Sequence, residues 1–311
     1  LGEVAAAAFA PLIVGASPVL FGLDSFRELG QPLNLTGTFS NADYVRWKGL
    51  LDLEDSRFIG IALPRMLMRL PYRDDGSATY NFRFREIVGG PGHGGYLWGS
   101  AAFAFAAVLI RGFKDFGWFA DIRGAPRDRL GGGLVDGLPI HSFATDAPGI
   151  ATTYSTEVSI TDPLEMELSQ LGFISLCKSK NSDYSVYYSN QSIQKPKSYD
   201  SALASANARI SAMLQTVLCV SRFSHYIKVM ARDRVGSFET AEACEKYLQD
   251  WLFNYCSADE TASVEIKARY PLVEAKVDVR EIPGKPGSYH CTAHLRPHAP
   301  VSYTHLRAHE T

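Results

Sequence analysis

Two alternating segments near the end of the chain, Ala275 to Ile282 and Ser288 to Arg296, constrain the fold most. The loop between them, PGKPG, carries enough proline and glycine to favour a reversal, so the pattern predicts a β-hairpin. Val277 and Val279 should share one face of the first strand. The same period places four residues of the second strand on one face: Tyr289, Cys291, Ala293 and Leu295. Because an isolated hairpin is marginal in water, it needs a partner surface or added strands.

The residues before the hairpin predict helices. Thr240 can cap a helix whose apolar residues recur at i, i+3, i+4, i+7, i+8 and i+11: Cys244, Tyr247, Leu248, Trp251, Leu252 and Tyr255. This is the clearest amphipathic pattern in the chain. The segment Ala202 to Arg232 is also helical in composition, with Ile210, Val217 and Ile227 on a broad apolar face.

The first half of the chain mixes strand and helix signals. Arg57 to Leu63 reads as a strand stopped by Pro64, and Leu97 to Phe116 as a buried helix that Gly117 ends. Trp118 to Arg123 indicates a short strand. Gly131 to Gly133 and the pair Gly137 and Pro139 mark an irregular connection.

A strand, a helix and a second strand follow in order. Thr156 to Ile160 alternates as a strand, and Asp162 can then cap a helix with Pro163 in its first position. Gly172 suits the end of that helix, and Phe173 to Cys177 reads as the next strand. This order favours an α+β or mixed α/β architecture over a helical bundle. We expect a mixed body over residues 1–200, a helical segment over 201–257 and a hairpin region over 258–298.

Composition narrows the class. A hydrophobic fraction of 46% and a charged fraction of 21% are normal for a globular protein. With 31 basic and 33 acidic residues the chain has no net positive charge that would attract nucleic acid, so a nucleic-acid partner is disfavoured. The five cysteines form no CxxC pair, which favours reduced thiols in a cytoplasm. Val4 to Leu23 is uncharged, but Pro11 and Pro18 interrupt it and alanine drives insertion poorly, so we reject a membrane helix.

Several residues invite a catalytic or ligand-binding interpretation that their spacing disfavours. Cys219 and His225 lie six residues apart on a predicted helix, which leaves their side chains roughly 120° apart around the axis. His290, His294 and His298 lie on an extended segment, where four residues cover about 13 Å, so the three cannot share one zinc ion. The glycine runs at 89–95 and 131–133 lack the Lys-Ser/Thr of a phosphate loop. We therefore expect no catalytic, metal or cofactor residues.

Motifs along nearly the whole chain resemble one family. The run CVSRFSHYIKVMARDRVGSF begins at Cys219 and LRPH at Leu295; other matches include EVAAAAFAP, SPVLFGLDSF, YLWGSAAFAFA, TEVSITD and QSIQKPKSYD. In the same order these blocks occur in the large subunit of the type VI secretion contractile sheath, the TssC or VipB family, which the chain resembles. It departs from the family at Gln215 and Thr216, where a Pro-Tyr pair is common, so we expect a weaker break in the helix there.

The resemblance implies a structural and mechanical role without a cofactor. It implies a cytoplasmic bacterial subunit that assembles with a small subunit, TssB or VipA, and with neighbouring large subunits around an Hcp tube on a baseplate. A ClpV-type ATPase would act indirectly, through the small subunit. Two alternatives remain, a phage-type contractile tail sheath and a cytosolic α/β hydrolase. We further expect residues 1–298 to be a truncated piece of the subunit, and 299–311 to be a non-native tail that resembles a translated sequencing adapter.

Sheath subunits of this family have interwoven sheets, so the hairpin is the expected platform for strands from neighbouring subunits. The hypothetical interface residues are those of its apolar faces: Val277, Val279, Tyr289, Cys291, Ala293 and Leu295. On this view proline at Val279 should remove a donor from the ladder of the hairpin.

Overall fold

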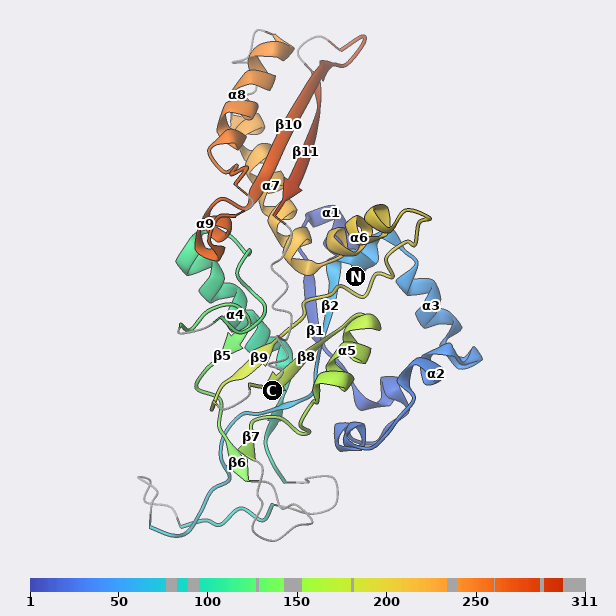
Figure 1. Cartoon of the computed structure of the whole chain (residues 1–311), viewed down its shortest axis with the longest axis vertical. Coiled ribbons are helices and arrows are strands. Elements are labelled where there is room, and N and C mark those ends of the chain that lie inside the picture. Colours follow the sequence, from blue (N-terminus) through green and yellow to red (C-terminus); the bar gives the residue numbers. More distant parts are fainter. Residues whose placement is uncertain are drawn as a thin grey trace, which may run out of the picture.

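A computed structural model of the chain describes residues 1–76, 83–88, 95–126, 129–142, 153–179, 182–233, 240–259, 261–285 and 288–298 (Figure 1). A body built around a sheet occupies the lower two thirds of the view, and a hairpin with long helices extends above it. The architecture is mixed α/β, as predicted.

The central sheet of the body has five strands in the order β1-β2-β8-β9-β5. These are β1 (Leu12–Gly15), β2 (Ile59–Leu63), β8 (Phe173–Lys178), β9 (Ser185–Tyr187) and β5 (Leu134–Val135). The β1–β2 and β2–β8 pairs are parallel, whereas β8–β9 and β5–β9 are antiparallel. Two small antiparallel pairs accompany the sheet: β3 (Met66–Leu67) with β4 (Trp98–Gly99), and β6 (His141–Ser142) with β7 (Thr153–Tyr154).

Apolar side chains are buried on both faces of the central sheet. Along β8, Phe173 and Cys177 join one core cluster while Ile174 and Leu176 join another. A strand covered on both faces reads as a nearly continuous apolar run, and FISLC is apolar except for the buried Ser175. The predicted strand at Phe173 to Cys177 is thereby confirmed.

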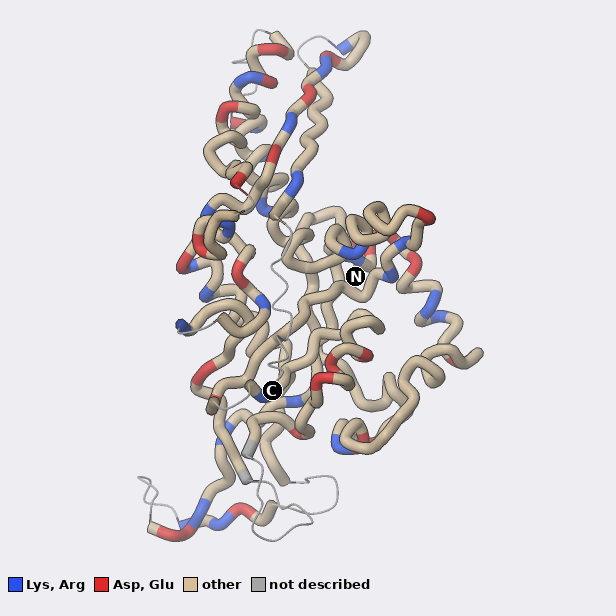
Figure 2. The backbone as a smooth tube through the Cα atoms, in the orientation of Figure 1, with Lys and Arg blue, Asp and Glu red and all other residues tan. Residues whose placement is uncertain are grey.

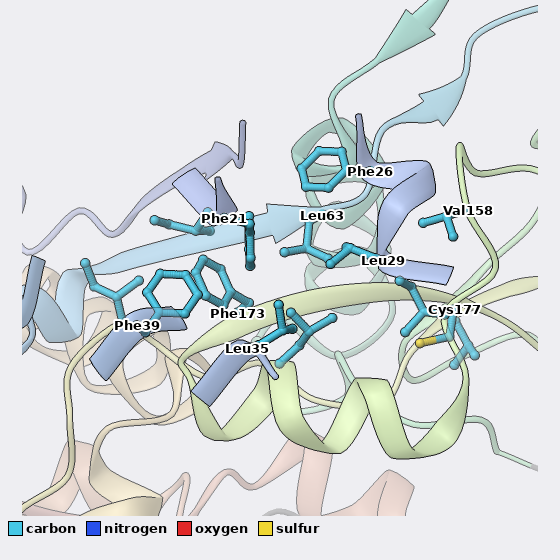
Figure 3. Packing of buried hydrophobic residues seen from close by; sticks show 14 of the residues in the cluster. Phe21, Phe26, Leu29, Leu35, Phe39, Leu63, Val158, Phe173 and Cys177 are labelled. Carbon is cyan, nitrogen blue, oxygen red and sulfur yellow. The ribbon is translucent and has the colours of Figure 1, made fainter. Parts of the chain in front are cut away.

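Helix α4 (Ala101–Phe116) packs on one face of the sheet, where Phe105 and Val108 are buried with Ile174. The other face holds an aromatic cluster in which Phe21, Phe39 and Phe173 lie side by side (Figure 3). This second face is covered by short helices: α2 (Leu35–Ser40), α3 (Val45–Leu51), α5 (Asp162–Gln170), and the 3-10 turns Pro18–Phe21, Phe26–Gly30 and Ala42–Tyr44. A further 3-10 turn, Glu54–Phe58, instead packs against the first helix, where Phe58 meets Phe9 edge-on.

A third core cluster lies in the upper part of the molecule. Its buried residues come from the loop after α4, from α7 (Leu214–Asp233) and α8 (Ala241–Phe253), and from β10 (Leu272–Glu281), while β11 (Tyr289–Pro297) adds half-buried residues. Two shorter helices lie outside this cluster: α6 (Ala202–Ser211) contacts α7, and α9 (Val264–Arg269) contacts α4. β10 and β11 form the predicted antiparallel hairpin, with Val277 opposite Ala293 and Val279 opposite Cys291. The helix capped by Thr240 is confirmed as α8, since the Thr240 side chain accepts a hydrogen bond from the Ala243 N–H.

Four predicted boundaries or strands are wrong. Arg57 and Phe58 belong to a 3-10 turn, so β2 begins only at Ile59. The buried helix begins at Ala101 rather than Leu97, because Ser100 caps it. Trp118 to Arg123 forms no strand: Trp118 packs in the third cluster, and Gln215 Nε2 donates to the Ala120 carbonyl at 2.5 Å instead of a strand neighbour.

Thr156 to Ile160 is also not a strand. The Glu157 N–H donates to the Arg65 carbonyl, and the fully buried Glu157 side chain binds the Arg65 guanidinium through two contacts of 2.6 and 2.7 Å. Ser25 donates a third hydrogen bond to the same carboxylate at 2.7 Å. The segment therefore forms only an isolated antiparallel bridge, between Thr156 and Met66, and the buried Glu157 carboxylate beside it is paired with Arg65.

The cap of one helix also differs from prediction. α5 is capped by Thr161 rather than Asp162, although Pro163 lies in its first turn and Gly172 has a φ of +88° just beyond its end. The helical segment breaks between α6 and α7 at Ala212 and Met213, and α7 continues without interruption through Gln215 and Thr216, so a weaker break than in the family stays a prediction. Val4 to Leu23 contains α1 (Gly2–Ala8), β1 and a 3-10 turn, and no described helix is long and apolar enough to span a bilayer.

Candidate intersubunit interface

The Arg-Phe-x-His-Tyr run on α7 is the hub of the upper core. Phe223 is fully buried and stacks on Trp118 with 4.2 Å between ring centroids. Trp251 and Tyr255 meet the same Phe223 ring edge-on at 5.8 and 5.7 Å. These contacts join α7 to α8 and to the loop after α4, and they fix the base on which the hairpin rests.

The same run holds the first helix of the chain. The His225 Nε2 lies 2.8 Å from the carbonyl oxygen of Ala8, and the Lys228 ammonium lies 4.4 Å from the centre of the Phe9 ring. Phe9 caps α1 with a φ of 49°, a left-handed conformation that side chains other than glycine adopt rarely. The motif therefore has a packing role at the base of α7.

Helix α8 covers the inner face of β10. The side chains of Val277 and Val279 are buried there against Cys244, Leu248 and Leu252. Figure 2 shows basic and acidic positions alternating along β10. The strand period and the burial pattern place these residues on the opposite, outer face: Glu274, Lys276, Asp278 and Arg280. The inner face thus belongs to the core of the subunit, and the outer face is polar.

The register shows which backbone groups point away from the hairpin. The Ile282 N–H donates to the Ser288 carbonyl at 2.8 Å, so the pairs formed by even-numbered residues exchange the ladder bonds. In an antiparallel pair the remaining residues direct their N–H and C=O groups to the outer edges. The outward groups therefore belong to Ala275, Val277 and Val279 on β10, and to Cys291, Ala293 and Leu295 on β11.

Side chains of α8 occupy the outer edge of β10. Gln249 Oε1 accepts from the Val277 N–H at 2.8 Å, while Gln249 Nε2 donates to the Ala275 carbonyl at 2.8 Å. Glu245 Oε2 accepts from the Val279 N–H at 3.0 Å. The expectation that proline at Val279 would remove a ladder donor is consequently wrong, because this N–H bonds to α8 and not to β11.

The outer edge of β11, unlike that of β10, is not bonded to side chains of any described helix. Within the described ranges, no hydrogen-bond partner lies at the outward N–H and C=O groups of Cys291, Ala293 and Leu295. The inner-face side chains of β11 are also less covered than those of β10: Cys291 is exposed, and Tyr289, Ala293 and Leu295 are half-buried. The apolar core of the hairpin is therefore open on the side of β11.

The six interface residues predicted from the sequence fall into two groups in the structure. Val277 and Val279 are buried in the subunit's own core, and their backbone donors are occupied. Tyr289, Cys291, Ala293 and Leu295 lie on the less covered strand: Cys291 is exposed and Ala293 half-buried, whereas Tyr289 and Leu295 pack in part against the third cluster. Sequence reasoning missed Gln249 and Glu245, although their spacing of four residues beside the Cys244–Leu248–Leu252 stripe indicates that they flank the strand-facing side of α8.

The cysteine and histidine residues considered as catalytic candidates make packing and hydrogen-bonding contacts within the subunit. Cys219 is buried in the third cluster, and burial raises its pKa to about 12, which keeps the thiol protonated. His225 binds the Ala8 carbonyl instead. Among the residues that the structure describes, no group of three His, Cys, Asp or Glu side chains could hold a metal ion.

The glycine runs also have a local explanation where they are described. Gly133 passes so close to β9 that a Cβ atom there would lie 2.1 Å from the Tyr187 carbonyl oxygen. Arg111 of α4 binds the carbonyl groups of Gly132 and Leu134, which fixes the turn into β5. The run at 89–95 falls outside the described residues except for Gly95.

Comparison with known proteins agrees with the motifs. Residues 1–194 match the VipB family, described as EvpB/VC_A0108, tail sheath N-terminal domain. Residues 203–308 match VipB_2, the EvpB/VC_A0108 tail sheath gpW/gp25-like domain. The type VI secretion system sheath protein TssC1 of Pseudomonas aeruginosa strain PAO1 is 40% identical over 299 residues, which are 96% of this chain and 59% of that protein.

A cryo-EM structure of the anti-feeding prophage baseplate contains a chain with a TM-score of 0.48 and 11% identity; the match covers 88% of this chain and 63% of that one. A likeness of this size carries no functional weight. The two family matches and the 40% identity to TssC1 are decisive, and they show that the chain belongs to the VipB family of tail sheath proteins.

Proposed function

We propose that this chain acts as a structural subunit of the type VI secretion contractile sheath, and that neighbouring sheath subunits add extended strands to the outer edge of β11. The single observation that carries the proposal is the asymmetry of the hairpin. Side chains of α8 occupy the edge of β10, while the outward backbone groups of Cys291, Ala293 and Leu295 are open.

An added strand would pair the outward backbone groups of β11 and would also cover its exposed apolar side chains. Its backbone would pair with the outward N–H and C=O groups, as in other cases of β-strand addition. Its alternate side chains would cover Cys291 and Ala293 and would extend the apolar core. An unpaired edge beside a half-covered core is a hazard in a monomer, and burial in a polymer removes that hazard.

The wider assembly follows from family membership and remains part of the proposal. The partners are a small sheath subunit of the TssB or VipA type, neighbouring large subunits, an Hcp tube and a baseplate, all in the bacterial cytoplasm. A ClpV-type ATPase would act through the small subunit. Membership in a sheath family favours this non-enzymatic role over the hydrolase alternative.

Proline substitutions test the β11 edge in a full-length background coexpressed with the small subunit. Ala293→Pro removes an outward donor and spares the ladder to β10, a position where edge strands tolerate proline. We expect the subunit to fold but to form no sheaths by electron microscopy. Thr292→Pro instead removes an N–H that points to β10, so it should destabilise the subunit itself.

The matched control is Ala293→Val, which keeps the donor and the strand propensity and should assemble normally. Sheaths of wild-type length that contract, formed by the Ala293→Pro subunit, would contradict strand addition at β11.

A further inference from the structure

We infer that Gln249 is a specificity-determining residue that mimics a strand and closes the β10 edge, with Glu245 beside it, so that subunits can add strands to the hairpin on the β11 side only. This inference rests on the proposed function. It assigns a role to two side chains that the function itself does not require.

The carboxamide of Gln249 reproduces the bonding of a neighbouring strand. A paired strand residue offers β10 one carbonyl acceptor and one N–H donor, and Gln249 offers an acceptor to Val277 and a donor to Ala275, both at 2.8 Å. The orientation of the amide is forced, since a flipped carboxamide would set a donor against the N–H and an acceptor against the carbonyl.

Glu245 occupies the β10 edge two residues further along the strand than Gln249 does. Its carboxylate accepts from the Val279 N–H at 3.0 Å, and Val279 is the next outward residue after Val277. A carboxylate has no donor for a carbonyl, and its charge at a strand edge opposes pairing with another chain. Gln249 and Glu245 are four residues apart on α8, so one helix face delivers both to the same edge.

The consequence is directional assembly. A hairpin with two open edges would accept strands on both sides and could pair with a second hairpin through the wrong strand. With β10 closed, the intersubunit sheet grows from β11 alone.

The experiment uses the full-length subunit carrying Ala293→Pro, in which the β11 edge is blocked, so that association through β10 can be seen separately. Gln249→Met removes both hydrogen bonds and keeps the length of the side chain and its helix propensity. Asp250→Met is the control, because it places the same apolar side chain on an exposed position of α8.

Two measurements decide the matter. Amide hydrogen exchange at Val277 should become about tenfold faster in the Gln249→Met subunit, the change expected for one lost hydrogen bond. Sedimentation velocity should show concentration-dependent self-association of this subunit, and none in the Asp250→Met subunit. If Gln249→Met prevents folding, Gln249→Ala serves in both measurements.

Unchanged exchange at Val277, or an unchanged association state with Gln249→Met, would overturn the role of Gln249. This failure is distinguishable from failure of the proposed function, which would show as sheath assembly by the subunit that carries Ala293→Pro alone.

Discussion

Replacing Phe223 by alanine should strongly destabilise the upper part of the molecule. Phe223 is fully buried, and removal of a buried phenylalanine costs about 3–5 kcal/mol. Its ring also stacks on Trp118 at 4.2 Å and meets Trp251 and Tyr255 edge-on, and aromatic pairs contribute about 0.5–1.5 kcal/mol beyond burial. Because these contributions overlap, we expect a loss of about 4 kcal/mol, a large share of a stability of about 5–15 kcal/mol.

The assay is urea denaturation of the purified full-length subunit, followed by tryptophan fluorescence, because Trp118 and Trp251 both contact Phe223. Tyr226→Phe is the control: it keeps the ring beside Trp118 and loses only the hydroxyl that accepts from Arg222 at 2.7 Å. This control should change the free energy of unfolding by less than about 1.5 kcal/mol. An equally small change for Phe223→Ala would refute the assignment of the motif as the packing hub.

Four further predictions concern other residues of the molecule. Glu157→Gln should lower the free energy of unfolding by about 1–3 kcal/mol, because the buried carboxylate accepts charge-assisted hydrogen bonds from Arg65; unchanged urea denaturation would contradict this. A maleimide should modify Cys291 before Cys219, because Cys291 is exposed whereas burial of Cys219 blocks access and raises its pKa to about 12; equal rates in mass spectrometry would exclude this. The reaction of Cys291 should accelerate as the pH rises, because partial desolvation raises the pKa of its thiol and the thiolate is the nucleophile. Without the small subunit the wild-type subunit should aggregate through its open edge and Ala293→Pro should reduce light scattering; a monodisperse wild-type monomer at high concentration would count against the sheath role. Cys219→Ala should alter secretion only as far as it alters folding, so normal sheath assembly with loss of a measurable turnover would reverse the non-enzymatic assignment.

Local patterns predicted much of the upper part of the fold. The stripe on α8 and the alternation of the hairpin each repeat over several turns or residues, and the Thr240 cap and the buried Val277 and Val279 follow from those repeats. Short segments were less predictable. Thr156 to Ile160 alternates like a strand, but it forms only an isolated bridge to Met66 and buries Glu157 against Arg65, a contact between residues 92 apart in sequence.

The division of the interface also required three-dimensional information. Period two places Val277 and Cys291 on the same face, yet one is buried under α8 and the other is exposed. The sequence contains no signal for which strand α8 covers, since this depends on how α7 and α8 pack through Phe223 and Trp251. The closure of the β10 edge by Gln249 is likewise visible only once the register is known.

Hydrogen exchange of the β11 edge in assembled and unassembled protein tests the central claim most directly. The outward amides of Cys291, Ala293 and Leu295 should exchange rapidly in the free subunit and should become strongly protected in the sheath. The amides of Val277 and Val279 should be protected in both states, because α8 already binds them. Assembled sheaths in which the three β11 amides exchange as rapidly as in the free subunit would contradict strand addition at this edge.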